Sequence, residues 1–546
     1  MNKLYFTIII LALSGIFNFS IAQPAEKLDA AGYLAQKDYN HALEEYLKVY
    51  TSKKNDVEFN FNIGLCYLNV NDDKSKAVPF FEFCYNKGGY KDELLLYLGM
   101  SYMYAYKFDD AIKLFNEYRK KAGSKKYEQI DHFIENCESA KVLIKHPVNV
   151  TFENLGKEIN TKYPDYYPFV TRDHSMLYFT TRREGTQKLK SWHGYFTSDI
   201  YYSKVANGQW TKAKSIGPPI NTADDEECVY LSPDGKMMIL YLNSATASGD
   251  LYMTYYNTKT KVFSKPVRFN EPVNTPDLEL EGYITEDGSA LIVSSNRMEG
   301  FGETDLYIYR KLPSGEWGLP VNLGANINTK YKESFPVFDE KNNTLYFASE
   351  GHTNMGGSDI FKSKFDTVTH MFGPAVNIGY PINTPEDNIE FTLAENLRDG
   401  YISATRKEGF GDLDIYKVVF NDIEIRPTII RGAVSTRDTT KKNIAAIASI
   451  MDARTNEKID SKNVNPQSGR FVFAVEPGTY TLTVTSAGFD EYKEKIIVYD
   501  KSDYVSELEK NILLLKPGES PPPAVKEAVK GAPVTPASAP LKKKTP

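Results

Sequence analysis

A three-residue motif, Ile-Asn-Thr or Val-Asn-Thr, recurs five times in the middle of the chain and constrains its fold more than any other feature. Its asparagines lie 61, 53, 54 and 55 residues apart and are Asn160, Asn221, Asn274, Asn328 and Asn383. Between these copies runs a second motif, Asp-Ile/Leu-Tyr/Phe, whose aspartates are Asp199, Asp250, Asp305, Asp359 and Asp414. A unit of this length cannot bury its apolar face alone, so its copies must pack against one another.

Each interval carries short runs in which apolar and polar residues alternate, such as LYFTTR at 177–182 and LYFASE at 345–350. This alternation predicts β-strands. Four short strands per unit, repeated about an axis, are typical of a β-propeller blade, so the motifs predict five blades over residues 146–422. The segment at 150–161 has only the last strand of a blade. We expect it to pair with the strands of 385–420 and close the ring.

Through these motifs, residues 146–420 resemble the WD40-like, TolB-type propeller family. The resemblance implies a fold and says little about function. The first repeat departs from the others by a long insertion that carries Trp192, His193 and Tyr195. Because loops on a rigid scaffold often carry function, these three residues form a candidate interaction loop.

An acidic residue stands near the start of the first strand in each repeat: Asp165, Glu227, Glu281, Glu333 and Glu390. One hypothesis is that these acids ring the central channel, as a cation-binding or sugar-binding site would require. The alternative is that each acid pairs locally, with Arg182, Arg297 or Arg406 for example, or caps the Asn-Thr turn. An acid that recurs in every repeat fits a rule of the fold better than one asymmetric site, because buried carboxylates are normally paired.

Residues 23–145 show apolar residues at helical spacing instead. Tyr33, Tyr67 and Tyr102 are 34 and 35 residues apart, and Gly64 and Gly99 precede the last two by three positions. This pattern resembles the tetratricopeptide repeat, in which small residues let two helices approach each other. The resemblance implies either a groove that binds a peptide or partner helix, or a stack that packs against the next domain.

The helical region contains one proline and three cysteines whose surroundings matter for its packing. Pro79 is expected inside the second helix of the middle repeat, where it would be unfavourable. Cys66, Cys84 and Cys137 are expected as buried, inert thiols, although a Cys66–Cys84 disulfide is possible in an oxidising compartment.

The first 22 residues predict a secretory signal peptide. Lys3 precedes an apolar run from Leu4 to Ile16, and Ser20-Ile21-Ala22 provides a small-residue cleavage pattern. The alternative, a membrane anchor, would need an apolar run of ~20 residues. The signal therefore predicts export to the periplasm, with no transmembrane segment, and a location peripheral to the outer membrane.

The C-terminal part changes pattern again. Residues 427–515, with Gly469-Arg470-Phe471 and Gly478-Thr479-Tyr480, resemble the carboxypeptidase-regulatory-like family, which implies a small, non-catalytic β-sandwich. Residues 516–546 are rich in Pro and Lys and predict a disordered tail. The fold class is thus multidomain α and β: a tetratricopeptide-like array, a five-bladed propeller, a sandwich and a tail.

Composition excludes several functions. Lys and Arg number 65 against 71 Asp and Glu, a net charge of −6, which gives no electrostatic case for nucleic acid. Four cysteines in 546 residues are too few for a disulfide scaffold. The sequence holds no zinc-protease, nucleophile-elbow or phosphate-loop motif, so we expect no catalytic residue, no cofactor and no metal.

The order of these parts resembles the OmpA-like, PorE-like cell-envelope group associated with type IX secretion and gliding. The resemblance implies a non-enzymatic periplasmic scaffold whose helical groove and propeller face bind envelope or outer-membrane proteins. Peptidoglycan binding does not carry over, because that group's C-terminal OmpA-like domain has no counterpart here. A glycan-binding or peptide-binding propeller and a propeller glycosidase are the alternative interpretations.

Overall fold

The computed structural model describes residues 28–88, 91–185, 195–244, 247–394, 398–421, 428–438, 444–453, 455–476, 478–498 and 507–520. The predicted signal peptide, most of the predicted tail, Trp192 and His193 lie outside these residues. The chain divides into two compact units, residues 1–424 and 425–546, and each is described by itself.

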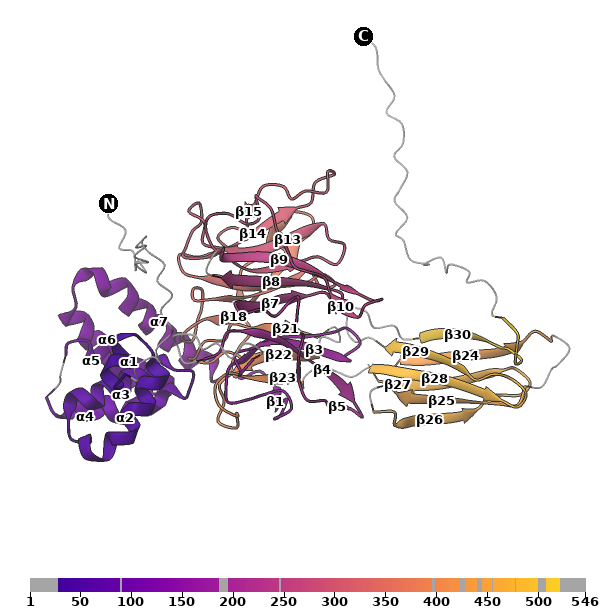
Figure 1. The fold of residues 1–546 in the computed structure, drawn as a ribbon, viewed down its shortest axis with the longest axis horizontal. Helices are drawn as coiled ribbons and strands as arrows, with labels where there is room; N and C mark the ends of the chain where they lie inside the picture. Colours follow the sequence, from indigo (N-terminus) through magenta and orange to yellow (C-terminus); the bar gives the residue numbers. More distant parts are fainter. Residues whose placement is uncertain are drawn as a thin grey trace, which may run out of the picture. The chain divides into compact units, whose positions relative to one another are not determined.

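The first unit begins with seven α-helices in the described residues (Figure 1). They are α1 (Ala30–Ala35), α2 (Tyr39–Lys53), α3 (Val57–Asn69), α4 (Val78–Asn86), α5 (Leu94–Tyr104), α6 (Phe108–Lys121) and α7 (Tyr127–Leu143). Short 3₁₀ turns, η1 (Lys74–Ala77) and η2 (Ser124–Lys126), precede α4 and α7. Asp29, Asp38 and Asp56 cap the first three helices, because each carboxylate accepts a free backbone N–H of the first turn.

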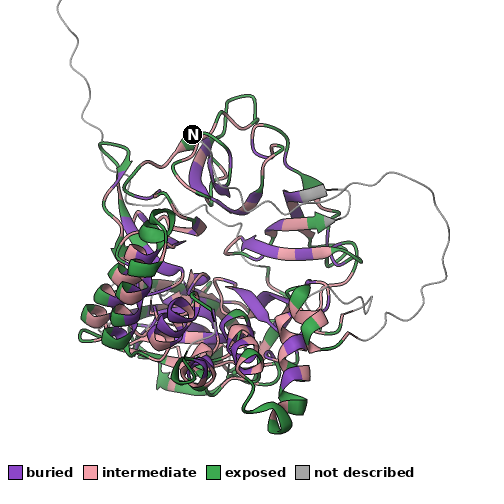
Figure 2. Cartoon of the chain, turned by 90° about the vertical axis from the view of Figure 1, so that its left-hand side faces the viewer, coloured by how far each residue is buried: buried purple, intermediate pink, exposed green. Residues whose placement is uncertain are grey.

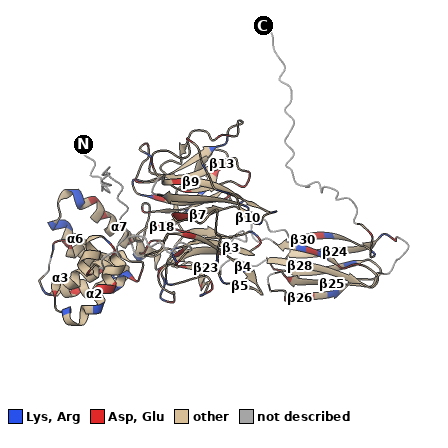
Figure 3. Ribbon diagram, in the orientation of Figure 1, with Lys and Arg blue, Asp and Glu red and all other residues tan. Residues whose placement is uncertain are grey.

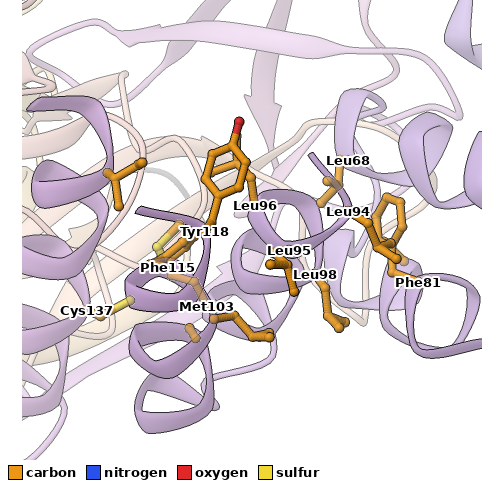
Figure 4. Packing of buried hydrophobic residues seen from close by; sticks show 14 of the residues in the cluster. Leu68, Phe81, Leu94, Leu95, Leu96, Leu98, Met103, Phe115, Tyr118 and Cys137 are labelled. Atoms are coloured by element: carbon orange, nitrogen blue, oxygen red, sulfur yellow. The ribbon is translucent and has the colours of Figure 1, made fainter. Parts of the chain in front are cut away.

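Glycine allows two pairs of helices to pack closely. A Cβ atom added at Gly64 would lie 2.8 Å from the ring of Phe81, and one added at Gly99 would lie 2.6 Å from the ring of Phe115. Both rings are fully buried (Figure 4). Because Gly64 and Gly99 have no side chain, α4 can pack closely against α3, and α6 can pack closely against α5.

Pro79 differs from the expectation. It lies in the first turn of α4, which begins at Val78. The missing N–H of a proline costs nothing there, because first-turn N–H groups have no intrahelical partner. The cysteines are buried free thiols, as expected; burial raises the pKa of Cys66 to about 12 and that of Cys84 to about 11.

The rest of the first unit is a β-propeller of antiparallel sheets (Figure 1). Sheet 1 holds β2 (Asp165–Val170), β3 (Met176–Thr181), β4 (Asp199–Ala206), β5 (Gln209–Trp210) and β6 (Lys214–Ser215). Sheet 2 holds β7 (Asp225–Leu231), β8 (Met237–Ser244), β9 (Ala247–Asn257), β10 (Val262–Phe263) and β11 (Val267–Arg268). Sheet 3 holds β12 (Glu279–Ile284), β13 (Ala290–Ser295), β14 (Asp305–Arg310) and β15 (Val321–Asn322).

Sheet 4 holds β16 (Glu333–Asp339), β17 (Thr344–Ser349), β18 (Asp359–Asp366), β19 (Met371–Phe372) and β20 (Val376–Asn377). Sheet 5 joins β21 (Phe391–Leu393), β22 (Asp399–Ala404) and β23 (Asp414–Phe420) to β1 (Val150–Asn154). The predicted pairing of the 150–161 segment with 385–420 is confirmed, with Val150 opposite Phe420 and Asn154 opposite Tyr416.

The recurring asparagine joins the strands of each sheet. Asn328 accepts the backbone N–H of Leu306 through Oδ1 and donates Nδ2 to the carbonyl of the same residue, at 2.8 and 2.9 Å. Asn221, Asn274 and Asn383 bond Ile200, Leu251 and Ile360 in the same way. Asn160 bonds Ile415, 255 residues away. A side chain that replaces two backbone hydrogen bonds explains why asparagine stands in every repeat.

The second unit consists of two sheets around one apolar core in its described residues. One sheet has the order β27 (Arg470–Val475), β24 (Thr428–Thr436), β30 (Glu507–Leu514); the other has β26 (Lys458–Asn463), β25 (Ala446–Asp452), β28 (Gly478–Ser486), β29 (Tyr492–Val498). Figure 2 shows the burial of each residue with the helices of the first unit toward the viewer. In the second unit, buried and exposed residues alternate along β27. Strand β27 has the pattern of a strand with one face on a core, with Phe471, Phe473 and Val475 buried.

Candidate functional site

Three glutamates from different sheets interact at the inner strands of the propeller. They are Glu227 on β7, Glu281 on β12 and Glu390 directly before β21. The charge of Glu227 raises the pKa of both Glu281 and Glu390, and the charge of Glu390 raises that of Glu281. The buried side chain of Tyr167 on β2 interacts with all three. We call this group the axial cluster.

An ion pair inside the protein compensates the charge of Glu227. Its carboxylate lies 3.1 Å from Nη2 of Arg182 and accepts the hydroxyl of Tyr166 at 2.6 Å. Arg182 also bonds Asp225 at 3.0 Å. The arginine belongs to sheet 1 and both acids to sheet 2, so the ion pair connects two sheets, unlike the pairing within one blade that the sequence suggests.

Glu281 and Glu390 pair with no arginine among the described residues. Burial raises the pKa of Glu281 to about 8 and that of Glu390 to about 7. Oε2 of Glu281 is buried and has no hydrogen-bond partner among the described residues. Glu390 accepts the backbone N–H of Tyr167 at 2.7 Å and the hydroxyl of Ser403.

The backbone explains why acids stand at these two positions. The inner strands β2 and β16 have register shifts, and Tyr167 and Phe335 lie in them with φ of +53° and +52°. A bulge leaves its N–H groups without ladder partners. Glu390 accepts the N–H of Tyr167, and a backbone bond from Phe335 acts on Glu281. Each glutamate therefore satisfies a bulge on the neighbouring sheet.

Asp165 and Glu333 lie elsewhere and do not join the axial cluster. Asp165 accepts the N–H of Thr161 at 2.6 Å and pairs with Arg183 at 2.5 Å. Glu333 accepts the N–H of Thr329 at 2.7 Å. Both are fully buried caps of the Asn-Thr turn, four residues after its threonine. Glu226 and Glu279 are the corresponding caps in sheets 2 and 3.

The five predicted acids therefore stand at three positions of the repeat. Asp165 and Glu333 follow the threonine of the Asn-Thr motif by four residues, Glu227 follows it by five, and Glu281 and Glu390 follow it by six. Counting from each threonine separates them, so this distinction was available in the sequence. Three aspartates of the Asp-Ile/Leu-Tyr/Phe motif accept loop N–H groups, as expected of turn-shaping residues: Asp305 from Phe301, Asp359 from Met355 and Asp414 from Phe410.

Two cavities lie at opposite ends of the inner strands. The axial cavity, about 140 Å³, lies where these strands end and is lined by residues of all five sheets, including Phe169, Tyr230, Tyr283, Val337 and Leu393. The second, the interdomain cavity, has a volume of about 750 Å³ and lies where β21 begins. Its lining comes from the helical region around η1 and from residues 384–390 and 403–411 of sheet 5.

The helical region is docked on the propeller. Asn136 of α7 donates to the carbonyl of Gly356 at 2.9 Å in a buried contact, and His132 stacks on Tyr331 with ring centroids 4.2 Å apart. Met355, from the propeller, belongs to the buried core of the helices. Lys74 pairs with Glu386 at 2.9 Å. The packing alternative for the helical repeats is therefore realised on this side of the helices.

Tyr195 is the one candidate loop residue among the described residues, and it joins the two parts. Its hydroxyl donates to Asp412 at 2.5 Å and accepts Nδ2 of Asn40 on α2 at 2.8 Å. This side chain is thus engaged inside the protein.

Neither a metal site nor a membrane helix is found where the structure is described. No group of three or more His, Cys, Asp or Glu there could hold a metal ion, and no helix there is long and apolar enough to cross a membrane. Acidic and basic residues alternate over the helices and sheets (Figure 3).

No protein-family model and no curated protein matches the chain. Among solved structures, TolB from Acinetobacter baumannii matches at 14% identity over 47% of this chain and 54% of its own, with a TM-score of 0.29. The chain thus matches about half the length of that structure. An α-L-arabinanase from Penicillium chrysogenum matches at 11% identity over 50% of this chain and 100% of its own, with a TM-score of 0.32.

A periplasmic gluconolactonase from Pseudomonas aeruginosa matches at 11% identity over 57% of this chain and 88% of its own, with a TM-score of 0.27. At such TM-scores these likenesses carry no argument about function. The propeller rests on the pairing of its own strands.

Proposed function

We propose that this protein is a non-enzymatic scaffold of the bacterial periplasm, an accessory component of an outer-membrane secretion or gliding assembly of the type IX kind. In this proposal the helices are a tetratricopeptide array, the five sheets are the blades of one ring, and residues 427–515 are a regulatory-like accessory domain. The OmpA-like, PorE-like order of parts and the predicted signal peptide support the compartment.

One observation supports a scaffold most: the helices are fixed to the propeller through buried contacts. Asn136, Met355 and the Lys74–Glu386 pair tie α7 and η1 to sheets 4 and 5. Domains move relative to each other unless the contact between them is large and apolar. Buried contacts around Met355 and Asn136 restrain the helices against the propeller, and a restrained orientation suits a protein that positions partners.

The experiment is crosslinking in intact cells followed by capture of the full-length protein from the envelope. We expect the same outer-membrane or secretion proteins in repeated captures, and their loss when docking is broken by Lys74→Glu. The control is Lys121→Glu, which changes the same charge at an exposed pair on α6. Recovery of no envelope protein by the wild type would contradict the proposal.

A propeller glycosidase is the second candidate, and Glu390 of the axial cluster favours it. Glycosidases need two carboxyl groups about 5–9.5 Å apart in an open pocket, one of them protonated near neutral pH. Glu390 lines the interdomain cavity, and its pKa is raised to about 7. Hydrolysis of a panel of polysaccharides that is lost in Glu390→Gln and Glu281→Gln would establish this activity. Equal turnover by the variants would eliminate these residues as its catalysts.

A further inference from the structure

Arg406 breaks the symmetry of the repeats. In sheet 1, Arg183 bonds the carbonyl of Ile159 and the cap carboxylate of Asp165. In sheet 3, Arg297 bonds the carbonyl of Val273 and the cap carboxylate of Glu279, at 3.4 and 3.2 Å. The same structural rule in two sheets shows what this arginine does in a repeat: it neutralises the acid that caps the Asn-Thr turn.

Sheet 5 keeps the arginine but not the acid. Arg406 bonds the carbonyl of Pro381 at 3.0 Å, and its guanidinium lies over the ring of Phe152, 3.4 Å from the centroid. The cap position is Asn388, whose Oδ1 accepts the N–H of Thr384 at 2.6 Å. That bond occupies the acceptor of the amide, and its NH₂ group is a donor like the guanidinium.

The guanidinium forms no ion pair with a carboxylate among the described residues. Burial lowers the pKa of Arg406, and the charge of Glu408 offsets this only in part. The Nε of Arg406 is buried with no hydrogen-bond partner among the described residues. Leaving a charged donor uncompensated in a partly buried place is costly. Arg406 and Asn388 both line the interdomain cavity, so the missing carboxylate would come from a ligand there.

The other charges of the cavity restrict the ligand further. Its lining contains Asp72, Asp73, Glu386, Asp387, Glu390 and Glu408 against Lys74, Lys76, Arg406 and Lys407. Lys74 forms an ion pair with Glu386, and Lys76 forms one with Asp72. Acids therefore remain in excess around Arg406, which disfavours phosphate or a dicarboxylate and favours a ligand that also carries a cation.

We propose that the interdomain cavity binds a small zwitterion of the amino-acid type, with its carboxylate on Arg406 and its ammonium group toward the acidic wall. The volume of about 750 Å³ accommodates such a ligand, and Tyr104 and Tyr106 provide apolar surface beside it. This proposal goes beyond the proposed scaffold function and does not rest on it.

The test is calorimetric titration of the full chain with each of the twenty free amino acids, with the methyl ester of each binder, and with succinate and inorganic phosphate. We expect at least one amino acid to bind, and its ester, succinate and phosphate to bind at least tenfold more weakly. The proposal is overturned if no amino acid binds or if the esters bind as well as the acids.

Asn388→Asp is the decisive variant, because it restores the internal carboxylate found in sheets 1 and 3. It should lower the affinity for the amino acid at least tenfold while the melting temperature stays the same or rises, which separates loss of the site from loss of the fold. Arg406→Gln should also lose binding. The matched control is Lys362→Gln, which removes an exposed positive charge on β18 outside the lining of the cavity and should bind within twofold of the wild type. Unchanged affinity in Asn388→Asp would overturn the proposal.

Discussion

At the scale of single residues, the Asn-Thr motif has two separate functions in the fold. Its asparagine replaces two backbone hydrogen bonds between strands, and its threonine presents N–H and hydroxyl groups to a buried acid four residues later. The charge of a buried acid needs a compensating partner, and in sheets 1 and 3 this partner is an arginine. In these two sheets the motif is thus part of a unit of asparagine, threonine, acid and arginine.

The pKa of Glu281, raised by burial to about 8, predicts a pH dependence of stability. Between the ordinary value of 4.5 and about 8, the unfolded chain releases this proton and the folded chain keeps it. The folded state therefore binds more protons, and the free energy of unfolding falls as pH rises through this window. Glu281→Gln should flatten the fall.

The measurement is urea unfolding of wild type and variant at several pH values from 5 to 9. The control is Glu299→Gln, which replaces an exposed glutamate of the same sheet and should keep the wild-type slope. An identical slope in Glu281→Gln would show that the buried carboxyl does not titrate in this range.

At the scale of elements, the glycine at position 99 allows α5 and α6 to pack closely. Gly99 on α5 faces the ring of Phe115 on α6 so closely that any Cβ atom forces movement. Gly123, in the same region, has no atom within 4 Å of its would-be Cβ and an ordinary φ of −69°. The pair provides a matched comparison of a packed and an open glycine.

We expect Gly99→Val to destabilise the helical region by about 2–3 kcal/mol, since overfilling a packed core displaces its neighbours. Gly123→Val should change stability by less than about 0.5 kcal/mol, as at most surface positions. Thermal unfolding followed by helical circular dichroism measures both. Adding Phe115→Leu to Gly99→Val should recover part of the loss, and equal losses at both glycines would contradict the packing argument.

Some of these elements can be predicted from the sequence alone, and others cannot. Spacing of Tyr67, Gly64 and Ala77 predicts a packed helical repeat, and the offset of residues 150–161 predicts the closing strand, because both depend on local periodicity. The axial cluster was only partly predictable, because bulges at Tyr167 and Phe335 decide which acid reaches a neighbouring sheet. A bulge moves the side chains that follow it to the opposite face of the sheet. The alternation of apolar and polar residues in a short strand does not show where a bulge lies.

At the scale of the whole molecule, the helices and propeller are joined by a half-buried ion pair as well as by apolar contact. The side chains of Lys74 and Glu386 are 11% and 29% exposed. Breaking a buried pair costs more than an exposed one, because the remaining charge stays unpaired. Reversing the charge of Lys74 should therefore weaken the contact between the helices and the propeller.

Lys74→Glu should release the helical region, seen as faster hydrogen exchange in η1 and α7 with little change in β13 and β17. The double variant Lys74→Glu with Glu386→Lys should restore slow exchange, since it rebuilds the pair with opposite polarity. Slow exchange in the single variant would mean that the apolar contacts around Met355 suffice for docking.

The sequence by itself determined the repeats and the helical or strand character of each part, because these depend on periodicity over residues close in the chain. The tertiary structure alone decided that Glu227, Glu281 and Glu390 meet, that Tyr195 bonds Asn40, and that Arg406 faces a cavity without a carboxylate. These facts depend on residues up to hundreds of positions apart, whose meeting is fixed only when the ring closes and the helices dock.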